Sequence, residues 1–189
     1  MSQVILVTGA NGFVGRAVSR ALPQRGEQTV GLVRRAQGPS GIGREWIHDR
    51  PDFVDIDRAW SPGLQCDAVI HLAARVHVMH DHATEPLDAY RATNVQGALR
   101  VARAARAAGA ARFVYVSSIK AVAESSSGRP PLSEHDAPLP LDPYGISKLE
   151  AERALANYGR ESGMEVVIVR PPLVYGPGVR ANFLSLMGA

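Results

Sequence analysis

VILVTGANGFVG, residues 4–15, joins a short apolar run to three regularly spaced glycines, and a helical pattern follows it. Gly9 permits a tight turn, Gly12 lets a pyrophosphate approach the backbone, and Gly15 lets a helix pack on a strand. The N-terminus of such a helix offers free N–H groups and a positive dipole end to phosphate. The stretch therefore predicts a dinucleotide cradle. The residues expected to contact the cofactor here are Gly9, Asn11, Gly12, Phe13, Val14 and Gly15.

Apolar runs alternate with helical patterns along the rest of the chain. The expected strands are Val4–Val7, Thr29–Val33, Glu45–His48, Ala68–Leu72, Phe113–Ser117 and Glu165–Val169, and the expected helices are Phe13–Leu22, Leu87–Ala108 and Tyr144–Glu161. Near-continuous apolar strands separated by helices are typical of a parallel sheet buried on both faces. We therefore expect an α/β fold with a Rossmann-type, doubly wound parallel sheet and helices on both faces. The Pro/Ser/Gly-rich stretches 124–143 and 171–178 are expected to be loops at the ligand-binding edge.

The composition excludes several classes of protein. With 46% hydrophobic and 21% charged residues, the chain is typical of a globular domain and not of a disordered or fibrous one. It contains no apolar run of the ~18–20 residues that span a bilayer, so no membrane partner is expected. The lone Cys66 excludes an intramolecular disulfide and a multi-cysteine zinc site. A cytoplasmic location is expected.

The net charge of +3 and the pI near 9.3 raise the question of nucleic-acid binding. Arg100, Arg103 and Arg106 align at helical spacing and could form a basic stripe. A solvated helix face is the better explanation of that pattern, and no aromatic-rich nucleic-acid motif accompanies it. No nucleic-acid partner is therefore expected.

The end of the second expected strand bears on the choice of dinucleotide. A carboxylate there would hydrogen-bond the ribose 2′-hydroxyl of NAD, whereas an arginine can accept the 2′-phosphate of NADP. The strand ends GLVRR at residues 31–35, with Arg34 about 20 residues after the glycine loop and no acid present. NADP is favoured and NAD remains possible, because Arg34 and Arg35 could also be ordinary surface residues.

YGISK, residues 144–148, places Tyr144 and Lys148 on one face of a helix that Asp142 can cap. A tyrosine with a pKa near ~10 is a poor acid–base catalyst at neutral pH. A nearby ammonium favours the phenolate and would lower that pKa. Upstream, Ser117 and Ser118 end an expected strand, where a hydroxyl could hydrogen-bond a substrate oxygen. The candidate catalytic residues are Ser118, Tyr144 and Lys148.

Together, the TGxxGxxG loop, the strand-end Ser-Ser and the YxxxK helix resemble the extended short-chain dehydrogenase/reductase (NAD-dependent epimerase/dehydratase) family. More closely, the chain resembles the nucleotide-sugar epimerases and 4-ketoreductases related to UDP-galactose 4-epimerase. DAVIHLAA, residues 67–74, and RPPLVYGPG, residues 170–178, also match segments of that family.

The resemblance implies a role for each candidate residue. Ser118 would orient a sugar hydroxyl or ketone, Tyr144 would act as the acid–base, and Lys148 would support both the tyrosine and the nicotinamide ribose. The residues that it assigns to the cofactor are Asp49 at the adenine, Leu72, Ala73, Ala74 and Asn94 along it, and Pro172 near the nicotinamide. It assigns Asn182, with Ser118, to the substrate, a UDP-sugar.

Departures from the family pattern narrow the expected reaction. Sugar-nucleotide 4,6-dehydratases carry an Asp-Glu pair where this chain has Ile119 and Lys120, which argues against elimination of water. Epimerases generally keep an acid where Arg34 stands. A net reductase fits NADP better than an epimerase does. Residues 117–120, 171–172 and 181–184 resemble those of bacterial enzymes that make UDP-N-acetyl-amino-sugars for surface polysaccharide, and this resemblance implies reduction of a UDP-linked 4-keto sugar. A UDP-sugar 4-epimerase with retained NAD, a reductase of steroid- or flavonoid-type carbonyls, and a catalytically silent NADP-binding sensor remain alternatives.

Three further expectations concern metal, assembly and domains. His71, His77, His80 and His82 are close in sequence, but no spacing puts three of them on one face, so no metal is expected. The long helix 87–108 matches a dimerisation element of the family and suggests a homodimer. Residues 1–178 are expected to form the NAD(P)-binding domain. Residues 179–189 would begin a substrate-binding lobe most of which is absent.

Overall fold

In the computed structural model, residues 2–36, 43–76, 85–128 and 130–179 are described. Within these ranges one parallel sheet has the strand order β3-β2-β1-β4-β5-β6. Its strands are β1 (Val4–Thr8), β2 (Gln28–Val33), β3 (Arg44–Ile47), β4 (Ala68–His71), β5 (Arg112–Val116) and β6 (Glu165–Val169). The strand order reverses between β1 and β4. The carboxyl ends of those two strands therefore border the crevice in which such sheets bind ligands.

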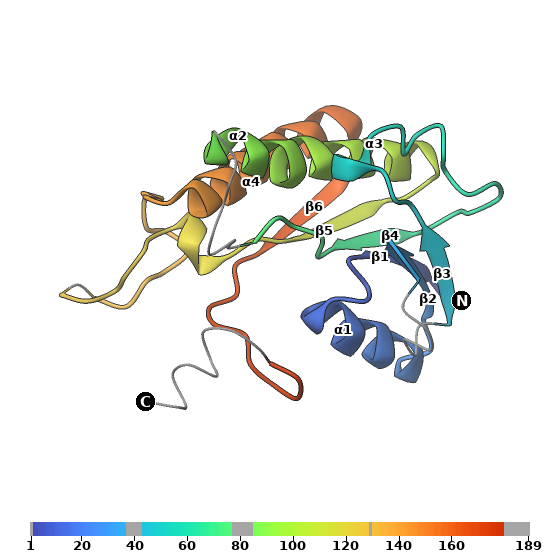
Figure 1. The fold of residues 1–189 in the computed structure, drawn as a ribbon, viewed down its shortest axis with the longest axis horizontal. Helices are drawn as coiled ribbons and strands as arrows, with labels where there is room; N and C mark the ends of the chain where they lie inside the picture. Colours follow the sequence, from blue (N-terminus) through green and yellow to red (C-terminus); the bar gives the residue numbers. More distant parts are fainter. Residues whose placement is uncertain (1, 37–42, 77–84, 129, 180–189) are drawn as a thin grey trace.

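Helices cover both faces of the sheet (Figure 1). The helix α1 (Phe13–Gln24) lies on one face. The other face carries α2 (Pro86–Arg91), η2 (Ala92–Gly97), α3 (Ala98–Ala107) and α4 (Pro143–Ser162). Two short 3₁₀ turns, η1 (Pro51–Phe53) and η3 (Ile119–Ala121), follow β3 and β5. The prediction of a doubly wound Rossmann-type sheet is confirmed.

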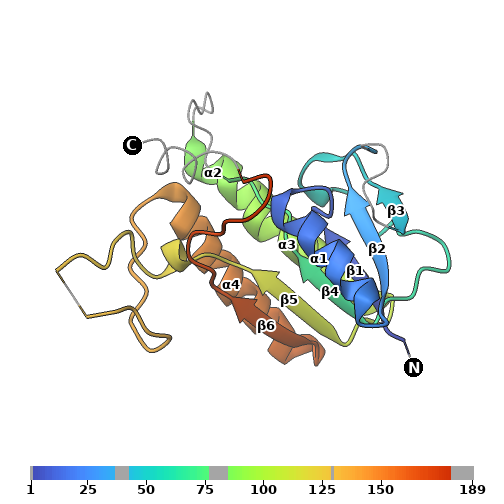
Figure 2. The same cartoon turned by 90° about the horizontal axis from the view of Figure 1, so that it is seen from below.

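Burial separates the central strands from β6. Leu6, Phe113 and Tyr115 are fully buried beneath α3 and α4, and Val7 is fully buried beneath α1. On β6 the burial alternates instead, and Val169 is 42% exposed on the face that α1 shares. Figure 2 shows that no described helix covers β6 on that face. The expectation of strands buried on both faces is therefore correct for the centre of the sheet and wrong for this described edge.

The expected single helix 87–108 is continuous but contains a π-helical turn, η2, between α2 and α3. Two side chains of η2 are held from outside the helix. The Thr93 hydroxyl donates a hydrogen bond to the Asp52 carboxylate, and the Asn94 amide contacts the loop after β4. Single π-helical turns are rare and occur frequently at functional sites.

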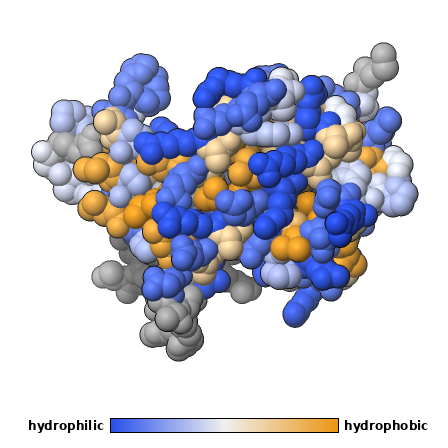
Figure 3. All heavy atoms as spheres, turned by 90° about the horizontal axis from the view of Figure 1, so that it is seen from above, coloured by the Kyte–Doolittle hydropathy of each residue, from blue (hydrophilic) through white to orange (hydrophobic). Residues whose placement is uncertain are grey.

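The three aligned arginines of α3 each have a structural partner. Arg100 donates to the backbone oxygen of Asp52, and Arg106 donates to that of Ser162. The guanidinium of Arg103 lies 6.0 Å from the centre of the Tyr158 ring. Figure 3 shows apolar and hydrophilic side chains interspersed on the outer surface of this helical layer. These arginines therefore attach α3 to its neighbours.

Among the described helices, none is both long and apolar enough to cross a membrane.

Candidate active site

The three glycines of the loop after β1 each lie where a Cβ would be crowded, most severely at Gly15. Gly9 has φ +65°, and a Cβ there would lie 3.0 Å from the amide nitrogen of Ala73. At Gly15 a Cβ would lie 2.1 Å from the carbonyl oxygen of Gly9, and at Gly12 it would lie 3.0 Å from the same oxygen. The loop is therefore folded tightly on itself and packed against the end of β4.

The first turn of α1 is open to an anion. Gly12 is the N-cap residue, no side chain caps the helix, and the first turn contains no acidic residue. The free N–H groups and the helix dipole are consequently not neutralised by the described protein. The Asn11 amide donates to the backbone oxygen of Arg35 at 3.2 Å and so joins the glycine loop to the end of β2. This arrangement fits a pyrophosphate.

A pocket of about 670 Å³ lies at the carboxyl ends of β1, β2 and β4. The predicted cofactor residues that line it are Gly9, Asn11, Gly12, Arg34, Leu72, Ala73 and Ala74. Its size is in the range of small-molecule sites. Its glycine floor leaves the close backbone approach that a dinucleotide needs. The residues present therefore fit an NAD(P) group.

Other predicted residues lie elsewhere. Phe13 and Val14 line a neighbouring groove between α1 and residues 174–179, which Asn11 also borders. Asp49 is exposed beyond the end of β3, and Pro172 is exposed beyond β6; neither lines either cavity. Asn182 lies outside the described residues. The cofactor and substrate roles of these residues stay predictions.

Sequence reasoning missed part of the pocket wall. His48, Arg50, Asp52 and Phe53 line it from the turn after β3. They reach it because β3 pairs in parallel with β2, and His48 donates its amide hydrogen to the carbonyl of Val33 at 2.9 Å. The signal available in the sequence was the third apolar run, whose end must lie beside the end of the second in a parallel sheet.

A buried hydrogen-bond network joins the end of β1, where the glycine loop begins, to the end of β4. The Thr8 hydroxyl lies 3.0 Å from Nδ1 of His71 and accepts hydrogen bonds from the amides of Leu72 and Ala73. Burial, and secondarily the charge of Lys148, lowers the pKa of His71 to about 3. The imidazole is therefore neutral, and we assign the Thr8 hydroxyl as the donor to Nδ1. His71 supports the loop, a role that the sequence did not indicate; His77, His80 and His82 lie outside the described residues.

Replacing His71 with phenylalanine should flatten the acid limb of the stability profile. Between pH about 6.5 and 3 the unfolded chain binds one more proton at this histidine than the folded chain does. Stability therefore falls as the pH drops through that window, with a slope of up to ~1.4 kcal/mol per pH unit from this group. Urea unfolding at pH 4.5–7.5 should give His71→Phe a shallower slope than wild type.

The exposed His135 provides the control for that measurement, because its side chain is 89% exposed. His135→Gln should leave the slope unchanged. A His71→Phe protein with the wild-type slope would show that the buried imidazole takes up no proton on unfolding in this window.

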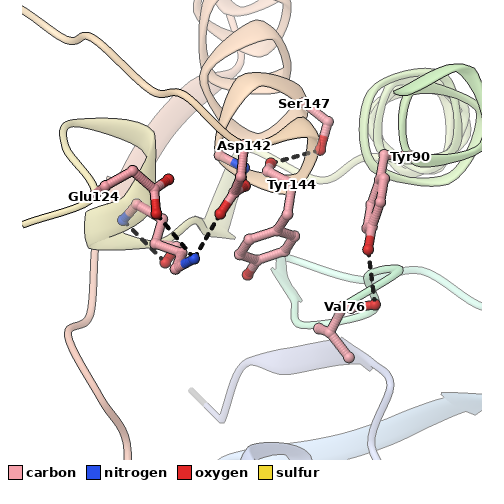
Figure 4. A network of polar contacts seen from close by, with 9 residues as sticks. Val76, Tyr90, Glu124, Asp142, Tyr144 and Ser147 are labelled. Atoms are coloured by element: carbon pink, nitrogen blue, oxygen red, sulfur yellow. Dashed lines mark hydrogen bonds and ion pairs between the residues drawn. The ribbon is translucent and has the colours of Figure 1, made fainter. Parts of the chain in front are cut away.

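Ser118 and Tyr144 are brought together by two helical starts. Ser118 caps η3, and its hydroxyl accepts the amide hydrogen of Lys120 at 3.2 Å. Asp142 caps α4 by accepting the amide hydrogen of Gly145 at 2.5 Å, which places Tyr144 in the first turn. The Ser118 hydroxyl lies close enough to the Tyr144 phenol to lower its pKa. In Figure 4 the phenol of Tyr144 points away from α4, on the side of the helix that faces Tyr90.

Lys148 lies one turn further along α4 and points into the protein. It is 1% exposed, and its ammonium donates to the carbonyl of Val116 at 2.7 Å and lies 4.1 Å from the centre of the Tyr115 ring. Burial lowers the pKa of Lys148 to about 7, and the charge of Glu152 opposes this.

Tyr144 has a raised pKa in this structure, chiefly because of burial. The expectation that the Lys148 ammonium lowers this pKa is therefore not met here. The Lys148 side chain points toward β5, where its ammonium binds the carbonyl of Val116. The groups that lower the pKa of Tyr144 are instead the Ser118 hydroxyl and the Lys120 ammonium.

Asn94 is almost completely buried, and its amide bridges two parts of the site. It accepts the amide hydrogen of Arg75 at 2.8 Å, and it donates to the carbonyl of Arg75 at 3.1 Å and to the hydroxyl of Ser147 at 2.9 Å. Since the pocket is not lined by Asn94, any effect on a cofactor would pass through Arg75 and α4.

The sequence of this chain is similar to those of known epimerases and reductases. The model of the NAD dependent epimerase/dehydratase family matches residues 5–187. A UDP-glucose 4-epimerase of Vibrio cholerae is 40% identical over 99% of this chain and 56% of its own length. A GDP-6-deoxy-D-mannose reductase of Pseudomonas aeruginosa is 30% identical over 100% of this chain and 58% of its own. The chain thus spans about half the length of the curated relatives that it matches.

The fold of this chain is also similar to those of solved short-chain dehydrogenase/reductase and epimerase structures. A short-chain dehydrogenase/reductase superfamily protein from Agrobacterium tumefaciens, solved with bound NAD, has a TM-score of 0.73 and 36% identity over 88% of this chain and 48% of its own. A UDP-glucose 4-epimerase from Thermotoga maritima, solved with UDP-glucose, has a TM-score of 0.78 and 27% identity over 92% of this chain and 57% of its own. The chain therefore belongs to the NAD dependent epimerase/dehydratase family.

Proposed function

We propose that this chain carries the cofactor and catalytic site of an oxidoreductase that reduces the 4-keto group of a UDP-linked sugar with NADPH. The observation that carries the proposal is the proximity of Ser118 and Tyr144, close enough for the serine hydroxyl to lower the pKa of the phenol, at the carboxyl edge of a sheet that also borders a pocket suited to a dinucleotide. Such reductions would supply precursors for surface polysaccharide.

In this mechanism the bound NADPH supplies the hydride. The Ser118 hydroxyl donates a hydrogen bond to the keto oxygen and orients it, and Tyr144 donates its proton to that oxygen as negative charge develops there. The raised pKa of Tyr144 keeps the phenol protonated at neutral pH, as a proton donor requires. Lys148, whose pKa is about 7, is proposed to hold a ribose hydroxyl and to support the tyrosine.

The preference for NADP rests on the charge at the pocket. Arg34 and Arg50 both line it, and no ion pair engages either guanidinium in the described part of the chain. No carboxylate stands at the end of β2. The acid on the pocket wall, Asp52, accepts the hydroxyl of Thr93. Two arginines with no acid at the end of β2 favour a 2′-phosphate over a 2′-hydroxyl.

Arg34→Asp should reverse the cofactor preference, because it replaces a phosphate-binding cation with a hydroxyl-binding carboxylate. The Kd of NADP should rise by roughly 100-fold or more while that of NAD changes far less. Isothermal titration with both cofactors measures this. The neighbouring Arg35 does not line the pocket, so Arg35→Asp is the matched control. Wild-type protein that binds NAD at least as tightly as NADP would contradict the preference.

A UDP-sugar 4-epimerase that retains NAD is the second candidate. It is favoured by the 40% identity to a protein named UDP-glucose 4-epimerase, and by a solved relative at 36% identity that holds NAD. The same Ser118 and Tyr144 would then serve both directions of hydride transfer at C4 of the sugar.

Anaerobic incubation with NADPH and a panel of UDP-sugars and their 4-keto derivatives separates the candidates. Oxidation of NADPH that requires a 4-keto compound supports the reductase. Interconversion of C4 epimers without net change in the cofactor supports the epimerase. Tight cofactor binding without turnover of any compound, steroid- or flavonoid-type carbonyls included, would support a silent NADP-binding sensor.

The same proposal includes a cytoplasmic homodimer. Cys66 is buried and free, and burial raises the pKa of its thiol to about 11, so it is unreactive and suits a reducing compartment. The helical layer from α2 to α3 is the proposed dimer contact. Light scattering behind size-exclusion chromatography tests the assembly.

A further inference from the structure

Lys120 binds across the junction that brings Ser118 and Tyr144 together. Its ammonium lies 2.5 Å from one carboxylate oxygen of Asp142 and 3.2 Å from the carboxylate of Glu124 (Figure 4). The Lys120 and Asp142 side chains are 34% and 20% exposed, so solvent screens this pair only in part. Lys120 is two residues after Ser118 and 22 residues before Asp142.

Asp142 uses its two oxygens for two different elements. One oxygen accepts the amide hydrogen of Gly145 and caps α4, and the other receives the ammonium of Lys120. A single carboxylate therefore connects the turn that carries Ser118 to the helix that carries Tyr144.

The two elements are also in direct backbone contact. A Cβ at Gly145 would lie 2.4 Å from the carbonyl oxygen of Lys120, so only a glycine allows α4 to come this close to η3. The amide of Leu139 donates to the carbonyl of Val122 at 2.8 Å and closes the intervening loop on the same turn. The ion pair thus lies where close backbone contacts leave η3 and α4 little room to shift relative to each other.

The charges of this junction act on the phenol. Burial raises the pKa of Tyr144 most, the Ser118 hydroxyl lowers it, Asp142 raises it, Lys120 lowers it, and Tyr90 raises it. The titratable or charged groups on the packed elements are Tyr90 on α2, Tyr115 on β5, Lys120 and Glu124 at η3, and Asp142 and Lys148 on α4. Lys148 is held by Val116 and Glu124 by Lys120.

We propose that Lys120 and Asp142 are a positioning pair, which fixes Tyr144 against Ser118 and presents opposite charges that offset each other at the phenol. The pair acts through Tyr144 and does not itself touch substrate. The proposal rests on the acid–base role of Tyr144 given above. It adds a function for Lys120, which the sequence marked only as a departure from the dehydratases.

Two charge-removing variants should then move the titration of Tyr144 in opposite directions. Lys120→Met leaves the Asp142 charge uncompensated and should shift the titration midpoint upward. Asp142→Asn keeps an equally good helix cap but leaves the Lys120 charge, and should shift the midpoint downward. The double variant should titrate close to wild type. Arg153→Met removes an exposed cation from the same helix and should leave the midpoint unchanged.

The measurement is a pH titration of protein labelled with ¹³C at the tyrosine Cζ, with the Tyr144 resonance assigned by its absence in Tyr144→Phe. Circular dichroism verifies that each variant is folded. If Lys120→Met does not fold, the proposal is tested by whether Asp142→Asn shifts the Tyr144 midpoint downward. Midpoints that agree with wild type, or that move in the same direction in both single variants, would overturn the proposal. Because the titration needs no substrate, its outcome is independent of the reductase assignment. Where wild type does reduce a ketone, the basic limb of its pH profile should move with the midpoint.

Discussion

Tyr144→Phe should lower turnover by about 10²- to 10⁴-fold while the Kd of the cofactor changes less than about twofold. The substitution removes only the hydroxyl that is proposed to donate the proton. The ring remains, so its edge-to-face contact with Tyr90, with centroids 6.2 Å apart, should persist and the first turn of α4 should keep its place. The measurement pairs steady-state oxidation of NADPH with cofactor titration on the same protein.

The matched control for that experiment is Tyr158→Phe. Tyr158 lies on the same helix, α4, where its ring packs against Arg103 and away from the candidate site. Its hydroxyl should be dispensable for turnover. Unchanged turnover in Tyr144→Phe, beside unchanged turnover in the control, would remove Tyr144 from the mechanism.

Gly15→Ala should abolish dinucleotide binding, with the Kd rising by roughly 100-fold or more, and should destabilise the fold by about 2–4 kcal/mol. The added Cβ would lie 2.1 Å from the carbonyl oxygen of Gly9 and 2.8 Å from two backbone atoms of Ala10. Backbone atoms cannot rotate away as a side chain can, so the glycine loop must move off β1. Isothermal titration and urea unfolding measure the two effects.

Gly43→Ala is the control for this substitution, since a Cβ at Gly43 meets nothing within 4 Å and the residue has no left-handed φ. Both cofactor affinity and stability should stay near wild type. A Gly15→Ala protein that binds the dinucleotide normally would contradict the close packing of α1 on the loop.

The fold was predicted almost completely because its signals are local. Each expected strand lies within about a residue of an observed one, from β1 to β6, since buried parallel strands are short apolar runs bounded by turns. The expectation was wrong at two places. The π-helical turn depends on contacts that Thr93 and Asn94 make with distant residues, and the exposed side of β6 depends on which elements pack over it.

The sequence predicted some residues of the candidate site but not how all of their side chains are placed. The glycine loop and the pair Tyr144 and Lys148 have fixed spacing within one element, so the sequence alone revealed them. The direction of Lys148, into the ring of Tyr115, and the exclusion of Asn94 from the pocket wall could not be read from spacing. Both depend on which neighbouring element lies beside the helix.

By itself, the sequence determined the doubly wound sheet, the glycine loop and the identity of Ser118, Tyr144 and Lys148 as candidates. Only the tertiary structure decided that His71 supports the loop, that Arg50 joins Arg34 at the pocket, and that Lys120 binds Asp142 where η3 meets α4. The physical reason is that periodicity and motif spacing reflect interactions along one element. Hydrogen bonds and ion pairs between residues far apart in sequence exist only after parallel pairing and helix packing have brought those residues together.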